Sequence, residues 1–270
     1  MSAIMRTFLR HGDEIICAEN SFIGFKVLAN ASGNRVNWIP LINFKHDLVA
    51  MADCINDYTK LIYLANPDNP TGTYFTKEEF DKFMNKVPER VLVILDEAYF
   101  EYAKHIDDYP DSMHYRYDNV ITLRTFSKAH GLAGFRVGYG FAHKDLIQNL
   151  LKIKLPFEPS WPGQVAAIAA LDDDGYIEGT VESCKTGKKD IEIALSQFGY
   201  EFILSSANFI TLLFESKSEA ESFNHLMLCN GIILRHLDGW GLPECVRMTI
   251  GTEEENSRFI KELDSFSKID

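Results

Sequence analysis

Short apolar runs alternate with amphipathic stretches along the first half of the chain. The runs are rich in β-branched and aromatic residues, and they cover residues 14–18, 61–65, 91–95, 120–123 and 136–142. Continuous apolar strands separated by helices are typical of a parallel sheet that is covered on both faces. The pattern therefore predicts an α/β fold in which a mostly parallel sheet is flanked by helices.

The clearest of the intervening helices is predicted over residues 76–87. Apolar side chains recur there at the i, i+3, i+4, i+7 spacing of one helix face, at Phe80, Phe83, Met84 and Val87. Thr76 and Glu79 have the types and spacing of a capping box, which satisfies backbone N–H groups at the start of a helix. We therefore expect this helix to cover one face of the sheet.

The second half of the chain has a different order of elements. Residues 143–155 and 163–198 are predicted to be mainly helical, and strands are predicted at 209–214, 231–237 and 245–251. This order is typical of a small α+β unit rather than a continuation of the parallel sheet.

Three prolines between residues 155 and 163 separate the two halves. We therefore expect a large domain over residues 1–155 and a smaller C-terminal domain over residues 156–270. Within the second domain, one helix is predicted to end at Asn230-Gly231, and the last helix is predicted to begin with the capping-box pair Thr252 and Glu255.

Composition narrows the class of protein. The chain carries 27 basic and 39 acidic residues, and its formal net charge of −12 argues against nucleic acid or an anionic membrane surface as a partner. No segment is long and apolar enough to span a membrane, and the N-terminal stretch does not have the pattern of a signal peptide. Five dispersed cysteines predict reduced thiols in the cytoplasm, and eight histidines without ligand spacing predict no metal site.

Polar side chains follow three consecutive predicted strands at the point where each strand ends. Asn69 follows the strand at 61–65, Asp96 and Tyr99 follow the strand at 91–95, and Lys128 follows the strand at 120–123. Ligands of open parallel sheets bind beyond the carboxyl ends of the strands. We therefore expect an amide, a carboxylate, a phenol and an amine to meet at one edge of the sheet.

Each of these residues also has a simpler interpretation. Asp96 could cap the next helix, Lys128 could be a surface lysine, and residues 69–72 could form only a turn. Arg136 could pair with an acidic neighbour. Their combination and order favour one chemistry, which is catalysis with pyridoxal phosphate (PLP).

PLP chemistry requires each of these side-chain types. A lysine bonds to the cofactor aldehyde, and a carboxylate keeps the pyridine nitrogen protonated. A phenol and an amide can hold the O3′ oxygen of the ring, and an aromatic side chain can stack on its face. Hydroxyl groups and an arginine bind the phosphate, which a guanidinium can contact through two parallel hydrogen bonds.

Four ordered motifs resemble the fold-type-I PLP-dependent aminotransferases, and within them the histidinol-phosphate aminotransferase group. The motifs are NPDNPTG, LDEAY, RTFSKAHGLAGFRVGYG and GLPECVRMTIGT. The resemblance covers essentially the whole chain. It implies a PLP-binding large domain and a smaller C-terminal domain, and a homodimer in which the active sites lie at the subunit interface.

The resemblance also implies roles for individual residues. Lys128 matches the lysine that bonds to the cofactor, and Asp96 matches the aspartate at the pyridine nitrogen. The remaining cofactor contacts match Tyr99 and Asn69 at O3′, Thr125, Ser127 and Arg136 at the phosphate, and Phe22 on the face of the ring. Phe22 stands where the family usually has tyrosine. Arg247 matches an arginine that binds a substrate carboxylate or phosphate, and Arg235 resembles a second anion-binding arginine.

The activity that the resemblance implies is transfer of the amino group of histidinol phosphate to 2-oxoglutarate in histidine biosynthesis. An aromatic amino-acid aminotransferase and a PLP-dependent decarboxylase of threonine phosphate remain alternatives. The family's N-terminal arm and glycine-rich phosphate loop have no counterpart in this sequence, which begins MSAIMRTFLRHGDE. A catalytically silent remnant of the family is therefore a further alternative.

Overall fold

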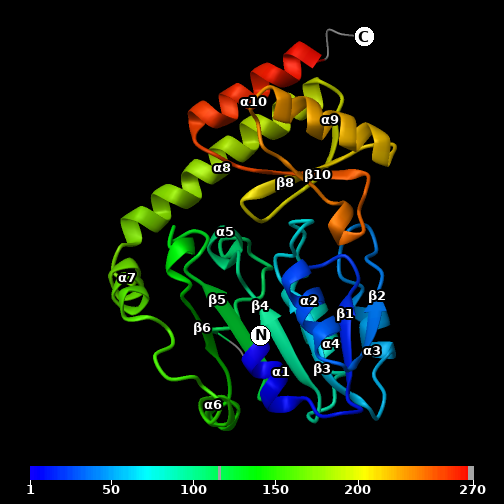
Figure 1. Ribbon diagram of the computed structural model, residues 1–270, viewed down its shortest axis with the longest axis vertical. Helices are drawn as coiled ribbons and strands as arrows, with labels where there is room; N and C mark the ends of the chain where they lie inside the picture. The colour runs from blue at the N-terminus through cyan, green and yellow to red at the C-terminus, as the bar shows by residue number, and fades with distance from the viewer. Residues whose placement is uncertain (115–116, 267–270) are drawn as a thin grey trace.

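The computed structural model describes residues 1–114 and 117–266, and it contains two sheets (Figure 1). The larger sheet has the strand order β2-β1-β3-β4-β5-β6. Its strands are β1 (Glu14–Ala18), β2 (Arg35–Ile39), β3 (Thr59–Ala65), β4 (Leu92–Asp96), β5 (Val120–Thr125) and β6 (Gly138–Phe141). Strands β1 to β5 pair in parallel and β6 pairs antiparallel with β5, so the predicted mostly parallel sheet is confirmed.

Helices cover both faces of the larger sheet because its central strands are apolar on both sides. Every residue of β1 and β4 is buried. Ile15 packs into a cluster with helices α1 and α2, whereas its neighbour Ile16 packs into a cluster with α3 and α4. The helices of this part are α1 (Ser2–Phe8), α2 (Ile23–Ala31), α3 (Leu48–Asp53), α4 (Lys77–Met84), α5 (Phe100–Ala103) and α6 (Lys144–Leu151). The predicted capping box at Thr76 and Glu79 begins α4.

The smaller sheet is antiparallel and has the strand order β7-β8-β10-β9. Its strands are β7 (Glu201–Ile203), β8 (Phe209–Leu213), β9 (Arg235–His236) and β10 (Cys245–Thr249). Helices α8 (Asp174–Gln197), α9 (Lys217–Cys229) and α10 (Glu253–Phe266) pack on it around one apolar cluster. Figure 1 shows α8 running diagonally from α7 (Trp161–Leu171) up to this sheet.

The two sheets fall on either side of residue 155, where the sequence predicted a division into two domains. The larger sheet uses residues 14–141, and the smaller sheet uses residues 201–249. The proline-containing segment at 155–163 leads from α6 to α7, and the sheets lie on either side of it along the chain.

Several elements differ from the sequence prediction for identifiable reasons. The helical stretch predicted at 163–198 is two helices, because the Asp173 side chain accepts a hydrogen bond from the Tyr176 N–H and so caps α8. The strand predicted at 231–237 is reduced to β9, an edge strand that pairs only with β10. Strands β2 and β7 were not predicted. Strand β2 is an edge strand with only Ile39 buried, so it lacks a continuous apolar run.

No helix of the described residues has the length and apolar character needed to cross a membrane. The same residues contain no group of three or more histidine, cysteine, aspartate or glutamate side chains that could hold a metal ion.

Candidate active site

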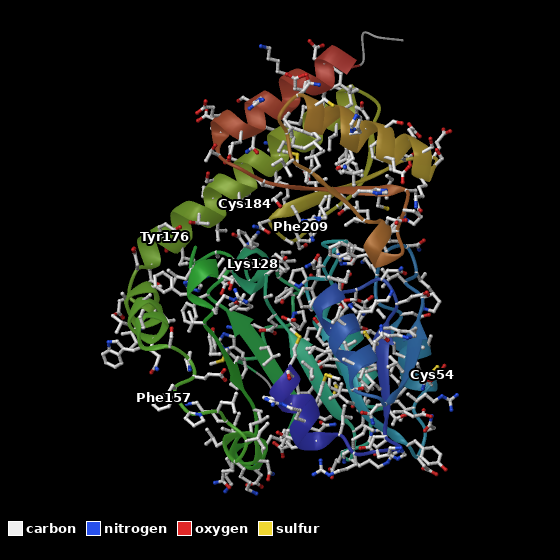
Figure 2. All side chains as sticks on the ribbon, in the orientation of Figure 1. Cys54, Lys128, Phe157, Tyr176, Cys184 and Phe209 are labelled. Carbon is white, nitrogen blue, oxygen red and sulfur yellow. The ribbon has the colours of Figure 1, made fainter. Side chains whose placement is uncertain are left out.

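A pocket of about 670 Å³ opens at the carboxyl ends of β3, β4 and β5. Figure 2 shows Lys128 at this level, between the larger sheet and Phe209 of the smaller one. All eight residues predicted to contact the cofactor line this pocket: Phe22, Asn69, Asp96, Tyr99, Thr125, Ser127, Lys128 and Arg136. The structure therefore brings together the side chains that the strand ends predicted to meet.

Asp96 is the buried carboxylate of the pocket. The Tyr63 hydroxyl donates a hydrogen bond to Oδ2 at 2.8 Å, and the backbone N–H of Ala98 donates to Oδ1 at 3.2 Å. Burial raises the pKa of Asp96, whereas these two hydrogen bonds and the charge of Lys128 act in the opposite direction. A carboxylate held in this way can be stabilised further by a cationic N–H group that enters the pocket.

Tyr63 was not predicted as a site residue. It lies in the middle of β3, fully buried, and its ring stacks on Phe25 with 4.0 Å between centroids. Ala65 of β3 pairs with Asp96 of β4, and residues two apart on a strand share a face. This register places Tyr63 on the same face as Asp96, so the strand pairing was the signal that could have identified it.

Lys128 is a half-buried amine with no hydrogen-bond acceptor within the portion of the chain that the structure describes. It lies in the turn after β5, where the Thr125 side chain accepts a hydrogen bond from the Ser127 N–H at 3.1 Å. Its Nζ is 5.0 Å from the centroid of the Tyr99 ring. The turn therefore presents a primary amine to the pocket without a carboxylate that would neutralise it.

Arg136 lies at the other side of the same turn. Its backbone is left-handed, with φ 54° and ψ 45°, at the end of the short helix η1 (Ala133–Phe135). The guanidinium is exposed and donates only to the Ala133 carbonyl, at 2.7 Å, among the residues described. Together with the hydroxyls of Thr125 and Ser127, it provides donors for an anion such as a phosphate.

A second arginine of this region, Arg124, lines the pocket but is already neutralised. Its guanidinium lies 2.7 Å from Glu97 and 2.9 Å from Asp111, and 3.3 Å from the centroid of the Phe100 ring. It was not predicted as a site residue. The ion pairs leave Arg136 as the arginine of the pocket with a free charge in the described chain.

Tyr99 and Asn69 complete the wall that faces the smaller sheet. Tyr99 is buried and its ring meets the edge of Phe209 at 5.3 Å between centroids. The loop that carries Asn69 is fixed from the smaller sheet: the Thr211 hydroxyl donates to the Pro70 carbonyl at 2.6 Å, and the Ser206 N–H donates to the Gly72 carbonyl at 2.7 Å. The smaller sheet therefore positions part of the pocket wall.

Arg247 lies on β10 at the border of the pocket and donates a hydrogen bond to the Asn69 side-chain oxygen. Its guanidinium lies 4.9 Å from the Phe209 ring and 5.8 Å from the Trp240 ring, and burial lowers its pKa. Its Nε has no hydrogen-bond partner within the described residues. Arg235, directly opposite on β9, is exposed. Neither arginine lines the pocket itself, and Arg247 reaches it only through its hydrogen bond to Asn69.

Comparison with known proteins identifies the family. The sequence model of the aminotransferase class I and II family matches residues 1–263. The chain belongs to this family. It is 43% identical over 254 residues to histidinol-phosphate aminotransferase 2 of Carboxydothermus hydrogenoformans, covering 93% of this chain and 70% of that protein. It is 40% identical over 267 residues to histidinol-phosphate aminotransferase of Geobacillus sp., covering 98% of this chain and 72% of that protein.

A solved structure supports the same assignment. The crystal structure of histidinol-phosphate aminotransferase from Sinorhizobium meliloti in complex with pyridoxal-5'-phosphate matches with a TM-score of 0.92 and 29% identity. The match covers 99% of this chain and 74% of that one. These comparisons confirm the resemblance that the four motifs indicated, and they confirm that the chain is an aminotransferase-family enzyme with PLP as its cofactor.

The residues of the pocket fit this cofactor. The aldehyde needs a primary amine without a competing carboxylate, and Lys128 provides it. The pyridine nitrogen needs a buried carboxylate, and Asp96 provides it. The phosphate needs uncommitted donors, and the turn at residues 125–136 provides two hydroxyls and the Arg136 guanidinium.

Proposed function

We propose that the chain transfers the amino group of histidinol phosphate to 2-oxoglutarate, with PLP as cofactor, in histidine biosynthesis. The proposal is supported by the two relatives and the solved structure, all named as histidinol-phosphate aminotransferases. The observation that carries it is Arg247, a half-buried arginine next to the pocket residue Asn69, with no carboxylate partner among the described residues.

The residues that would hold the cofactor are those of the pocket wall. Lys128 would bond to the aldehyde, and Asp96 would accept a hydrogen bond from the pyridine nitrogen. Tyr99 and Asn69 would hold the ring oxygen. Thr125, Ser127 and Arg136 would bind the phosphate, and Phe22 would pack on the ring.

The protein's own contribution to the reaction is proton control. Bound PLP supplies an electron sink for the bonding pair that is released at the amine-bearing carbon of the substrate. As a free amine, Lys128 Nζ would take the proton from that carbon as a general base and hold it as an ammonium group, from which it can be given back as a general acid. Asp96 would keep the pyridine nitrogen protonated, because an ionised carboxylate in a buried site favours the charged ring.

Substrate recognition is proposed to rest on Arg247. Arg235 and Arg247 are direct partners of β9 and β10, so their side chains share one face of the smaller sheet. Burial is the main cause of the lowered pKa of Arg247, and the like charge of Arg235 acts in the same direction as a weaker repulsion. An anionic group of the substrate, either phosphate or carboxylate, would relieve this repulsion and bind the arginine through two hydrogen bonds.

We also propose that the chain forms a homodimer in the cytoplasm. Large apolar side chains are exposed between α6 and the end of α7: Leu151, Leu155, Phe157, Trp161, Val165, Ile168 and Leu171. Phe157 is 97% exposed, and Figure 2 shows it on the connection between α6 and α7. Several large exposed apolar side chains within one segment of the chain are typical of a subunit interface. The five cysteines carry no disulfide among the described residues, in keeping with a reducing compartment.

The cofactor is tested first by absorbance. PLP is added to the purified wild type, to Lys128→Ala and to the control Lys154→Ala, which removes an exposed lysine outside the pocket. We expect a band near the visible that borohydride bleaches in the wild type and control, and no such band in Lys128→Ala. No band in a folded wild-type protein would refute the proposed activity and favour a silent member of the family.

The substrate is tested by glutamate formation from 2-oxoglutarate. Histidinol phosphate, histidinol and phenylalanine are compared as amino donors. We expect histidinol phosphate to have the highest kcat/KM. Equal or better use of phenylalanine would replace the proposed substrate with an aromatic amino acid, while leaving the aminotransferase activity in place.

A further inference from the structure

A buried carboxylate outside the pocket connects two of its walls. Asp68 lies in the loop after β3, and its side chain is fully buried. Ser21 and Thr71 each donate a hydroxyl hydrogen bond to it, Ser21 to Oδ1 and Thr71 to Oδ2, the latter at 3.0 Å. Both hydroxyl-bearing residues are also buried. A buried polar group raises the free energy of the folded state unless it forms hydrogen bonds, and the two hydroxyl groups provide them to Asp68.

The position of the cluster relates it to the pocket. Ser21 immediately precedes Phe22, and Asp68 immediately precedes Asn69, and both following residues line the pocket. Ser21 lies in the connection from β1 to α2, whereas Asp68 lies in the loop from β3 to α4. The Ser21–Asp68 hydrogen bond therefore connects two segments that are 47 residues apart and that each supply one wall residue.

The backbone of the Asp68 loop is held by further contacts. The Asp68 N–H donates to the Thr73 carbonyl, and the Gly72 N–H donates to the Asp68 carbonyl, both at 2.8 Å. The Nε2 atom of His46 lies 3.3 Å from Asp68 Oδ1, with both residues' side chains buried. Neither ring nitrogen of His46 makes a hydrogen bond within the described chain, so the two hydroxyls are the aligned donors to Asp68.

We propose that Asp68 is a positioning residue that, through Ser21, fixes Phe22 and Asn69 relative to each other on the cofactor pocket. This inference rests on the proposed function, because it assigns Phe22 and Asn69 to cofactor binding. An aspartate can accept from both hydroxyls at once, one at each oxygen. Asp68→Asn keeps the shape of the side chain, but it removes the negative charge and replaces one acceptor oxygen with an NH2 donor, so one of the two hydroxyl hydrogen bonds must reverse its direction.

The test measures the PLP dissociation constant by spectroscopic titration after the cofactor has been removed from each variant. Asp68→Asn should weaken PLP binding by about tenfold or more, because it removes the charged acceptor of both hydroxyl groups, and Ser21→Ala should weaken it by about three- to tenfold, because it removes one donor to that carboxylate. The control is Asp108→Asn, which also removes a carboxylate that accepts a tyrosine hydroxyl, from Tyr74, but lies away from the pocket. It should change the constant by less than about twofold.

A double variant separates a positioning role of Ser21 from an effect on general stability. If Ser21 acts through Phe22, then Ser21→Ala should have almost no further effect on PLP affinity in a Phe22→Ala protein. The visible circular dichroism of bound PLP, which reports the asymmetry of its surroundings, should also weaken in Ser21→Ala. If Ser21 contributes only to stability, Ser21→Ala should lower the free energy of unfolding both in the wild type and in Phe22→Ala. In that case the PLP dissociation constant should change by the same factor in both proteins.

The outcomes distinguish this inference from the proposed function. Dissociation constants within about twofold of the wild type for Ser21→Ala and Asp68→Asn, or an equal effect of Ser21→Ala with and without Phe22, would overturn the inference alone. If Asp68→Asn does not fold, Ser21→Ala decides the question. A wild-type protein that binds no PLP would overturn both the proposed function and the positioning role.

Discussion

Replacing Tyr63 by phenylalanine tests how the protein keeps Asp96 ionised. The substitution removes one hydroxyl, the donor of the 2.8 Å hydrogen bond to Asp96 Oδ2, and keeps the ring that stacks on Phe25. A hydrogen bond to a charged acceptor contributes about 1.5–3 kcal/mol. The Tyr63 hydrogen bond lowers the pKa of Asp96, so losing it should raise that pKa further.

The effect of Tyr63→Phe on the free energy of unfolding depends on pH, because the substitution raises the pKa of a buried carboxyl group. Burial raises the pKa of Asp96 in the folded protein above its value in the unfolded chain. In the cofactor-free protein, Asp96 therefore destabilises the fold more and more as the pH rises from the unfolded pKa to the folded pKa. Tyr63→Phe raises the folded-state pKa further. The variant should therefore lose about 1.5–3 kcal/mol at neutral pH, and less at a pH where Asp96 is protonated in both proteins.

The assay is urea unfolding of the cofactor-free wild type and variant at several pH values from 4 to 8. Tyr74→Phe is the matched control, because its hydroxyl donates to Asp108 at 2.9 Å near the surface, and its loss should cost less than about 1 kcal/mol. In the loaded enzyme, the acid limb of the kcat/KM profile should also move to higher pH in Tyr63→Phe. A pH-independent loss of stability, or one no larger than that of Tyr74→Phe, would refute the role assigned to this hydrogen bond.

Three further predictions concern the substrate, the pH dependence and the subunit interface. Arg247→Gln should raise KM for histidinol phosphate by about 10- to 100-fold in steady-state kinetics, whereas exposed Arg235→Gln should change it by less than about fivefold; equal effects would contradict the assignment. Burial raises the pKa of Glu97 from 4.5 to about 7, so the wild type should lose stability relative to Glu97→Gln across that range in urea titrations, and parallel curves would be contrary to expectation. Phe157→Ser combined with Trp161→Ser should weaken a dimer more than about tenfold in analytical ultracentrifugation, and an unchanged association constant would place the interface elsewhere.

The edge of the sheet that carries the pocket could be predicted from the sequence. Strands β3, β4 and β5 are continuous apolar runs, and polar residues begin where each run ends. A parallel sheet has its carboxyl ends on one edge, so the positions of Asn69, Asp96 and Lys128 followed from the pattern alone. The resemblance to a known family then gave these residues individual roles, which the experiments above test.

The contacts that support these residues could not be predicted in the same way. Tyr63 is one aromatic residue in an apolar run, and only the pairing of β3 with β4 shows that its hydroxyl reaches Asp96. Arg124 and Arg136 are both arginines near the end of one strand. Their difference depends on Glu97, which binds the first and not the second. Each of these contacts joins residues that the chain pattern does not place together.

The two arginines proposed to bind the substrate differ in their positions within the smaller sheet. Both lie on strands of the smaller sheet and pair directly with each other. The resemblance implied an anion-binding role for each of them. Strand β10 is an inner strand between β8 and β9, and Arg247 is covered by Phe209 and Trp240, whereas β9 is an edge strand and leaves Arg235 in water. Water screens the charge of an exposed arginine, whereas a buried guanidinium interacts more strongly with an anion that reaches it. Discrimination between anionic substrates should therefore depend mainly on Arg247, because its hydrogen bond to Asn69 also places it beside the cofactor pocket.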